Sequence, residues 1–122
     1  MSAPPISHLS YHVLLALADA DRHGYGIIKE IEERSGGAMR PGTGALYLAL
    51  QRMEEAGLIE ESPERPEPEE DDARRRYYRL TGGGRAEAER ESRRLAQLVL
   101  VAAEKRLLPS AELRPARAGR RA

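Results

Sequence analysis

The order of its apolar segments constrains the fold of this chain more than any other feature of its sequence. Three stretches with apolar residues at helical spacing come first, at about residues 7–20, 25–35 and 43–56. Two short strand candidates follow, at 58–62 and 74–80, and a polar loop separates them. Three helices followed by such a hairpin are the order of elements in a winged helix. We therefore predict a mainly α-helical fold with a small β-hairpin, a winged helix-turn-helix.

The boundaries of the third helix are marked by residues with known preferences. Thr43 is expected to be its N-cap, because a threonine hydroxyl accepts hydrogen bonds from free N–H groups at a helix start. Gly57 is expected to end it, since glycine is common just after a helix C-terminus. Its buried face is predicted from residues at i, i+4 and i+7, namely Leu46, Leu50 and Met53.

A fourth, longer helix is predicted at residues 82–108. Thr81 is expected to cap it and Pro109 to end it. The three glycines at 82–84 make its first turn costly, by about 1 kcal/mol per glycine relative to alanine. Residues 1–81 are then the winged domain, and residues 109–122, which are rich in Ala, Pro and Arg, are expected to be a disordered tail.

The second half of this fourth helix carries apolar residues that a small winged domain cannot cover alone. They are Leu95, Leu98, Val99, Ala102 and Leu107. One interpretation is that they pack back on the first helix of the same chain. The interpretation we prefer is that they form the interface of a two-fold homodimer.

Composition excludes several classes of protein. The 122 residues suffice for one domain of ordinary size. With no cysteine there are no disulfides and no thiolate metal sites. No apolar run approaches the roughly 20 residues that span a bilayer, and residues 1–8 lack the layout of a signal peptide, so a cytoplasmic location is expected. The only aromatic residues are five tyrosines, which predicts a thin aliphatic core and favours stabilisation by a partner subunit.

Charge is sorted along the chain, although the formal net charge is zero. The proline-containing loop at 63–72 is acidic, and Arg74, Arg75 and Arg76 follow it directly. A neutral total argues mildly against nucleic-acid binding, for which a basic face is expected. The arginine cluster nevertheless offers contacts to phosphate, whereas the acidic loop should point away from it. Asp71 and Asp72 are close enough in sequence to pair with these arginines when no nucleic acid is bound.

Four motifs in this order resemble the PadR family of transcriptional regulators. They are HGYGI at 23–27, GALY at 44–47, RMEEAGLI at 52–59, and RYYRLT at 76–81 with Gly84 after it. The resemblance covers residues 9–91, and the single C-terminal helix is similar to the short subfamily. It implies a dimeric, DNA-binding winged helix-turn-helix and a structural role for His23 in its turn. Ala45 stands where the family has Thr or Ser, and the wing is longer and more acidic than expected.

The third helix, at about residues 44–56, is expected to be the recognition helix, with its N-terminal part in the major groove. Gly44 would allow close approach of a phosphate, Leu48 could meet a thymine methyl and Gln51 could read adenine. The alternative for Leu48 is an ordinary exposed leucine. The candidate DNA-binding residues are Arg40, Thr43, Gly44, Tyr47, Leu48, Gln51, Arg52, Arg74, Arg75 and Arg76.

Tyr47 has two compatible interpretations. The family resemblance implies that it lies near the DNA backbone, and its place beside the buried face suggests that it braces the second and third helices.

The chain shows no combination of residues typical of catalysis. His8 and His12 have a spacing that can hold a metal, but no acid or cysteine completes a site, so no metal or other cofactor is expected. The resemblance implies a small-molecule effector, whose identity the sequence does not give. The alternative function is a winged helix that binds proteins, with the acidic loop as its docking surface.

Overall fold

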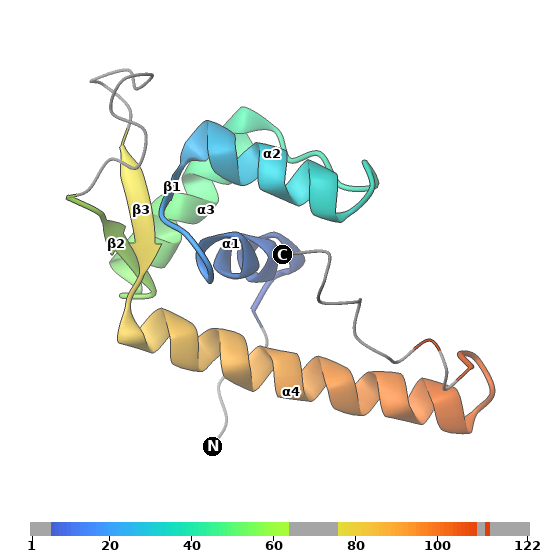
Figure 1. The fold of residues 1–122 in the computed structure, drawn as a ribbon. Helices are drawn as coiled ribbons and strands as arrows, with labels where there is room; N and C mark the ends of the chain where they lie inside the picture. Colours follow the sequence, from blue (N-terminus) through green and yellow to red (C-terminus); the bar gives the residue numbers. More distant parts are fainter. Residues whose placement is uncertain (1–5, 64–75, 110–111, 113–122) are drawn as a thin grey trace. The chain divides into compact units, whose positions relative to one another are not determined.

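The structure, a computed structural model, describes residues 6–63, 76–109 and 112 (Figure 1). The chain divides into two compact units, residues 1–91 and residues 92–122. In chain order the elements are α1 (His8–Leu17), β1 (Arg22–His23), α2 (Gly24–Arg34), α3 (Thr43–Glu55), β2 (Ile59–Glu61), β3 (Tyr77–Leu80) and α4 (Gly82–Glu104). This is the predicted mainly helical fold with a small sheet. No helix in the described part of the chain is long and apolar enough to cross a membrane.

The core of the first unit lies where α1, α2 and α3 pack together. The fully buried side chains are mostly aliphatic, as the composition predicts, and they include Leu14, Ile27, Leu46 and Leu50. All three residues predicted for the buried face of α3 are in this core. Its aromatic member is Tyr78, which reaches the cluster from β3.

The sheet has three antiparallel strands in the order β1-β3-β2. The predicted hairpin is confirmed as β2 and β3, with Ile59 opposite Leu80 and Glu61 opposite Tyr78. The strand β1 was not predicted; it pairs Arg22 with Tyr78 and His23 with Tyr77 of β3. A strand of two polar residues has no apolar alternation, and it forms because β3 offers a free edge beside the turn into α2.

The start of α3 differs from the prediction. Its N-cap is Gly42, which makes no side-chain cap bond, and Thr43 is already the first residue of the helix. The expectation that Thr43 caps α3 is therefore wrong, because the chain becomes helical one residue earlier than a threonine cap requires. Thr81, in contrast, does cap α4, since its hydroxyl accepts a hydrogen bond from the Gly84 N–H at 3.0 Å.

The end of α4 also differs from the prediction. The helix ends at Glu104, not at residue 108. Arg106 adopts a positive φ of 65°, and the Leu107 N–H donates to the Ala102 carbonyl at 2.8 Å. Gly57 has a positive φ after the end of α3 in the same way, but after α4 the residue with positive φ is not a glycine, so the sequence does not indicate the helix end. Leu107 therefore lies beyond the helix and does not continue the predicted apolar face.

Candidate nucleic-acid interface

The face of α3 opposite its buried residues is open to solvent. Tyr47 and Leu48 are each 46% exposed. Thr43, Gly44, Gln51 and Arg52 are exposed as well. The helix therefore presents the surface that the spacing of its apolar residues predicts. We call Gly44, Tyr47, Leu48 and Gln51 the α3 surface.

The start of α3 leaves polar groups available beside this surface. The first N–H groups of a helix have no partner within it, and at α3 the capping residue is a glycine without a cap bond. Adding a Cβ at Gly42 or Gly44 would meet no atom within 4 Å, so the backbone there can be approached closely. A helix start of this kind favours anions, of which a DNA phosphate is one.

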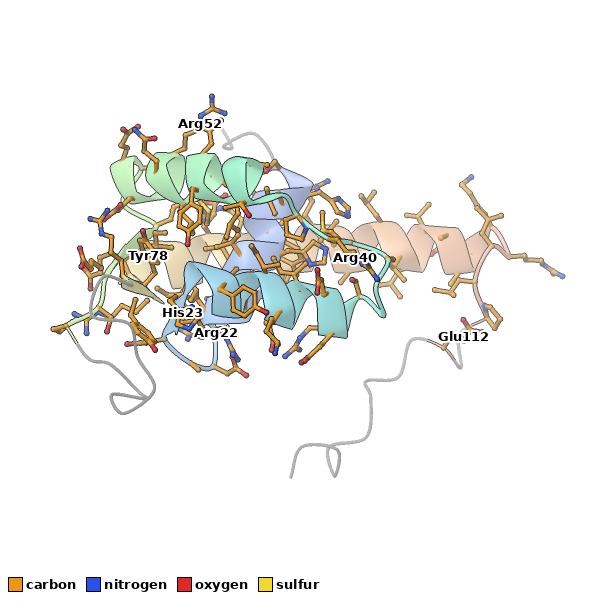
Figure 2. The ribbon with its side chains drawn as sticks, turned by 90° about the horizontal axis from the view of Figure 1, so that it is seen from above. Arg22, His23, Arg40, Arg52, Tyr78 and Glu112 are labelled. Carbon is orange, nitrogen blue, oxygen red and sulfur yellow. The ribbon has the colours of Figure 1, made fainter. Side chains whose placement is uncertain are left out.

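One of the candidate arginines precedes this helix and another belongs to it. Arg40 lies in the connection between α2 and α3, and Arg52 points outward from α3 (Figure 2). Both side chains belong to exposed residues. Neither forms an ion pair with an acidic residue in the described part of the chain, so both are available for phosphate.

Two arginines at the second strand of the hairpin, one just before β3 and one within it, are paired with glutamates of β2. Arg76 Nη2 donates to Glu61 Oε1 at 3.1 Å, and Arg79 Nε donates to Glu60 Oε2 at 2.8 Å. The hydrogen bond with Glu61 is the main cause that raises the pKa of Arg76 above its ordinary value. The sequence suggested Asp71 and Asp72 as partners for the arginines; these two residues lie outside the described ones, as do Arg74 and Arg75. Glu61 was missed because its role depends on how β2 and β3 are paired.

Tyr47 makes the bracing contact that the sequence suggested. Its hydroxyl end lies against Gly24, the first residue of α2, where a Cβ would come within 2.2 Å of the oxygen. Burial raises the pKa of the nearby Tyr78 phenol, and the Glu54 carboxylate and Tyr47 add to that shift while Arg76 opposes it. Tyr47 thus packs α3 against α2, near Tyr78 of the middle strand, β3.

His23 has a structural role in the turn, as predicted. Its Nδ1 accepts a hydrogen bond from the Gly26 N–H at 3.1 Å and so caps α2. Its ring also meets the edge of Tyr77, with 5.1 Å between ring centroids. The rings of His8 and His12 lie 5.6 Å apart, and among the described residues no third His, Cys, Asp or Glu joins them as a metal-binding group.

Three packed helices, a small antiparallel sheet and an exposed face on the third helix define a winged helix-turn-helix domain. Residues 13–90 match the model of the transcriptional regulator PadR-like family. The chain belongs to this family, whose members are regulators of transcription and not enzymes.

Similar proteins agree with this assignment. A PadR family transcription regulator from Clostridium difficile is 27% identical, with a TM-score of 0.65 over 80% of this chain and 97% of that one. PadR of Bacillus subtilis, solved in complex with operator DNA, has the same fold, with 22% identity and a TM-score of 0.57 over 68% of this chain and 46% of that one. An uncharacterized transposon protein of Streptomyces fradiae is 43% identical over 86 residues, which are 70% of this chain and 22% of that protein.

Proposed function

We propose that this protein is a homodimeric DNA-binding regulator, a repressor, that places α3 in the major groove of a pseudo-palindromic operator. The observation that carries the proposal is the α3 surface. It is exposed and uncharged, and it begins at a helix start whose N-cap, Gly42, makes no side-chain cap bond. Arg40 precedes it and Arg52 follows it in the chain, and neither is paired with an acid among the described residues. The B. subtilis relative, which has the same fold and was solved in complex with operator DNA, supports DNA binding by this chain.

In this proposal some residues position the protein on the DNA and others recognise its base sequence. Arg40, Arg52 and the backbone at the start of α3 would contact phosphates, which fix the protein on the duplex without reading its sequence. Leu48 and Gln51 would read base edges. In a two-fold dimer the two recognition helices would lie about 34–36 Å apart, one turn of DNA. An effector of unidentified class would alter DNA affinity, and the protein would act in the cytoplasm.

The test is a mobility-shift assay with the DNA upstream of the protein's own gene, at a series of salt concentrations. We expect binding at low salt that weakens steadily as salt rises, because bound arginines release counterions from the phosphates. Binding that is absent at low salt, or insensitive to salt, would contradict the proposal. A protein that binds no DNA would then fit the alternative, a protein-binding winged helix, which the pairing of Arg76 and Arg79 with glutamates favours.

Two substitutions separate positioning from reading in the same assay. Arg40→Ala should weaken binding to all DNA sequences alike and reduce the salt slope by about one. Gln51→Ala should relax preference at one base pair of each half-site and leave the salt slope unchanged. Arg34→Ala is the control for loss of a positive charge, since Arg34 lies at the far end of α2 and is paired with Glu30.

A further inference from the structure

The phenol of Tyr47 fills the space that a side chain at position 24 would need. A Cβ added to Gly24 would lie 2.2 Å from the Tyr47 hydroxyl oxygen, 2.5 Å from its Cζ and 3.0 Å from its Cε1. Real Cβ atoms essentially never make contacts this short, so Tyr47 lies where it does only because residue 24 is glycine. Gly24 is buried, whereas Tyr47 remains half exposed.

Gly24 is itself held firmly in place. It follows His23, which caps α2 through the Gly26 N–H and pairs with Tyr77 in the sheet. The His23 ring also packs on the Tyr77 ring. His23 thus links the first turn of α2, through its cap bond, to β3, through the strand pair and the ring contact with Tyr77. The first turn of α2 therefore forms a fixed support for the phenol.

Tyr47 stands among the residues proposed to read DNA. It precedes Leu48 in α3, and Gln51 follows it at i+4, so the three share one region of the helix surface. On its inner side α3 is closely packed, with Leu46 and Leu50 at 0% and 1% exposure. A phenol displaced from Gly24 therefore has room only on the solvent side, the side from which DNA would approach.

We propose that Gly24 is a positioning residue for DNA recognition: it lets the Tyr47 phenol lie against the start of α2 and keeps it out of the space beside Leu48 and Gln51. This proposal rests on the proposed function, since it assumes that DNA contacts the α3 surface. A buried glycine outside α3 would then determine which side chains of α3 can contact DNA.

The test compares four variants for DNA affinity at fixed salt. Gly24→Ala should remain folded, because the atoms that must move are the end of a half-exposed side chain, and it should bind about tenfold more weakly. Gly24→Ala combined with Tyr47→Ala should recover the affinity of Tyr47→Ala alone. Gly24→Ala combined with Tyr47→Phe should stay weak, because Cζ would still lie 2.5 Å from the new Cβ.

Gly26→Ala is the matched control within the same helix. A Cβ there meets its nearest atoms at 3.6–3.7 Å, which is ordinary van der Waals contact, so its affinity should equal that of the unchanged protein. If Gly24→Ala binds as well as Gly26→Ala, or if removing the phenol does not rescue Gly24→Ala, the proposal is wrong. Melting temperatures of all variants identify any loss of affinity that comes from unfolding.

A second readout separates this proposal from the proposed function. The NMR ring signals of Tyr47, assigned by comparison with Tyr47→Phe, should shift in Gly24→Ala and stay unchanged in Gly26→Ala. Unshifted signals would overturn the steric contact whether or not DNA binds. If the unchanged protein binds no DNA, the proposed function fails and the DNA part of the inference fails with it, while a shift would still establish the contact.

Discussion

At the scale of single residues, the candidate arginines differ in whether an acidic side chain already pairs with them. Arg40 and Arg52 have no acidic partner among the described residues, whereas the guanidinium of Arg76 is held by Glu61 at 3.1 Å. Both members of that pair are well exposed, so the pair itself contributes little stability. Its consequence for the proposed function is electrostatic, because the Glu61 carboxylate would repel a phosphate that approaches the guanidinium of Arg76.

Replacing Glu61 should therefore improve DNA binding. Glu61→Gln keeps the size of the side chain, removes the negative charge and frees Arg76, so we expect affinity at low salt to rise about two- to fivefold. Glu33→Gln makes the same change of net charge at an exposed position of α2 and should have a smaller effect. Titration of labelled operator DNA by fluorescence anisotropy measures both. Equal gains for the two variants would show that only net charge matters.

His12 should make the stability of the fold depend on pH. Burial, and then the charge of His8, lower the pKa of His12 from its ordinary 6.5. The unfolded chain therefore binds the proton more readily than the folded one, and stability should fall as pH drops below about 6.5 toward the lower folded-state pKa.

His12→Asn should remove this part of the pH dependence. Melting temperatures at pH 7.5 and pH 5 should differ less for the variant than for the unchanged protein, by about 3 °C at most, because the site is only partly buried. The His12 interpretation would be wrong if both proteins lost the same amount of stability between these pH values.

At the scale of helices and strands, the start of α4 shows why one of its three glycines, Gly84, is needed. A Cβ at Gly84 would lie 2.0 Å from the Leu58 carbonyl oxygen, and this atom belongs to the backbone. The same junction is closed by the Thr81 hydroxyl, which donates to the Gly57 carbonyl at 2.6 Å. The helix therefore begins in close contact with the turn that ends α3, and only glycine permits it.

Alanine substitutions at two of these glycines should have opposite effects. Gly84→Ala forces the backbone of α4 away from Leu58 and should lower the free energy of unfolding by about 2 kcal/mol or more. Gly82→Ala meets nothing within 4 Å and should raise it by up to about 1 kcal/mol. Urea denaturation followed by circular dichroism measures both. Similar values for the two variants would contradict the contact with Leu58.

These elements also show which parts of the fold a single sequence can predict. The helices were predicted because local periodicity reveals them, and Leu46, Leu50 and Met53 are buried as their spacing indicates. The features that were missed depend on distant partners or on backbone geometry without a local signal. The strand β1 exists because β3 lies beside it, and the left-handed turn at Arg106 ends α4 where the sequence has no glycine.

The same distinction between local sequence signals and contacts with distant residues applies to the candidate site. Exposure of the α3 surface follows from the helical spacing, so the sequence was sufficient for it. The pairing of Arg76 with Glu61 depends on the register of two strands, and the contact of Tyr47 with Gly24 depends on how two helices pack. A motif places these residues in order along the chain but does not give the distance between them.

At the scale of the whole molecule, the second half of α4 indicates a partner. Leu98, Leu100 and Val101 are among the large hydrophobic residues that remain exposed, and Leu98 is 53% exposed. The predicted interface residues Leu95, Val99 and Ala102 lie in the same helical segment. Exposed apolar residues gathered on one segment are typical of surfaces that bind another protein. A second copy of the chain is the occupant that the proposed two-fold operator would require.

A charge placed at Leu98 should therefore abolish both dimerisation and DNA binding. The unchanged protein should have twice the chain mass of 13.5 kDa in sedimentation equilibrium, and its melting temperature should rise with concentration. Leu98→Glu should be monomeric and should lose operator affinity by about 100-fold or more, because one recognition helix would have to bind alone. Gln97→Glu adds the same charge at an exposed neighbouring position and should remain dimeric. If the unchanged protein is monomeric at micromolar concentration, or Leu98→Glu still dimerises, α4 does not form the interface through Leu98, and the spacing of one DNA turn between recognition helices loses its basis.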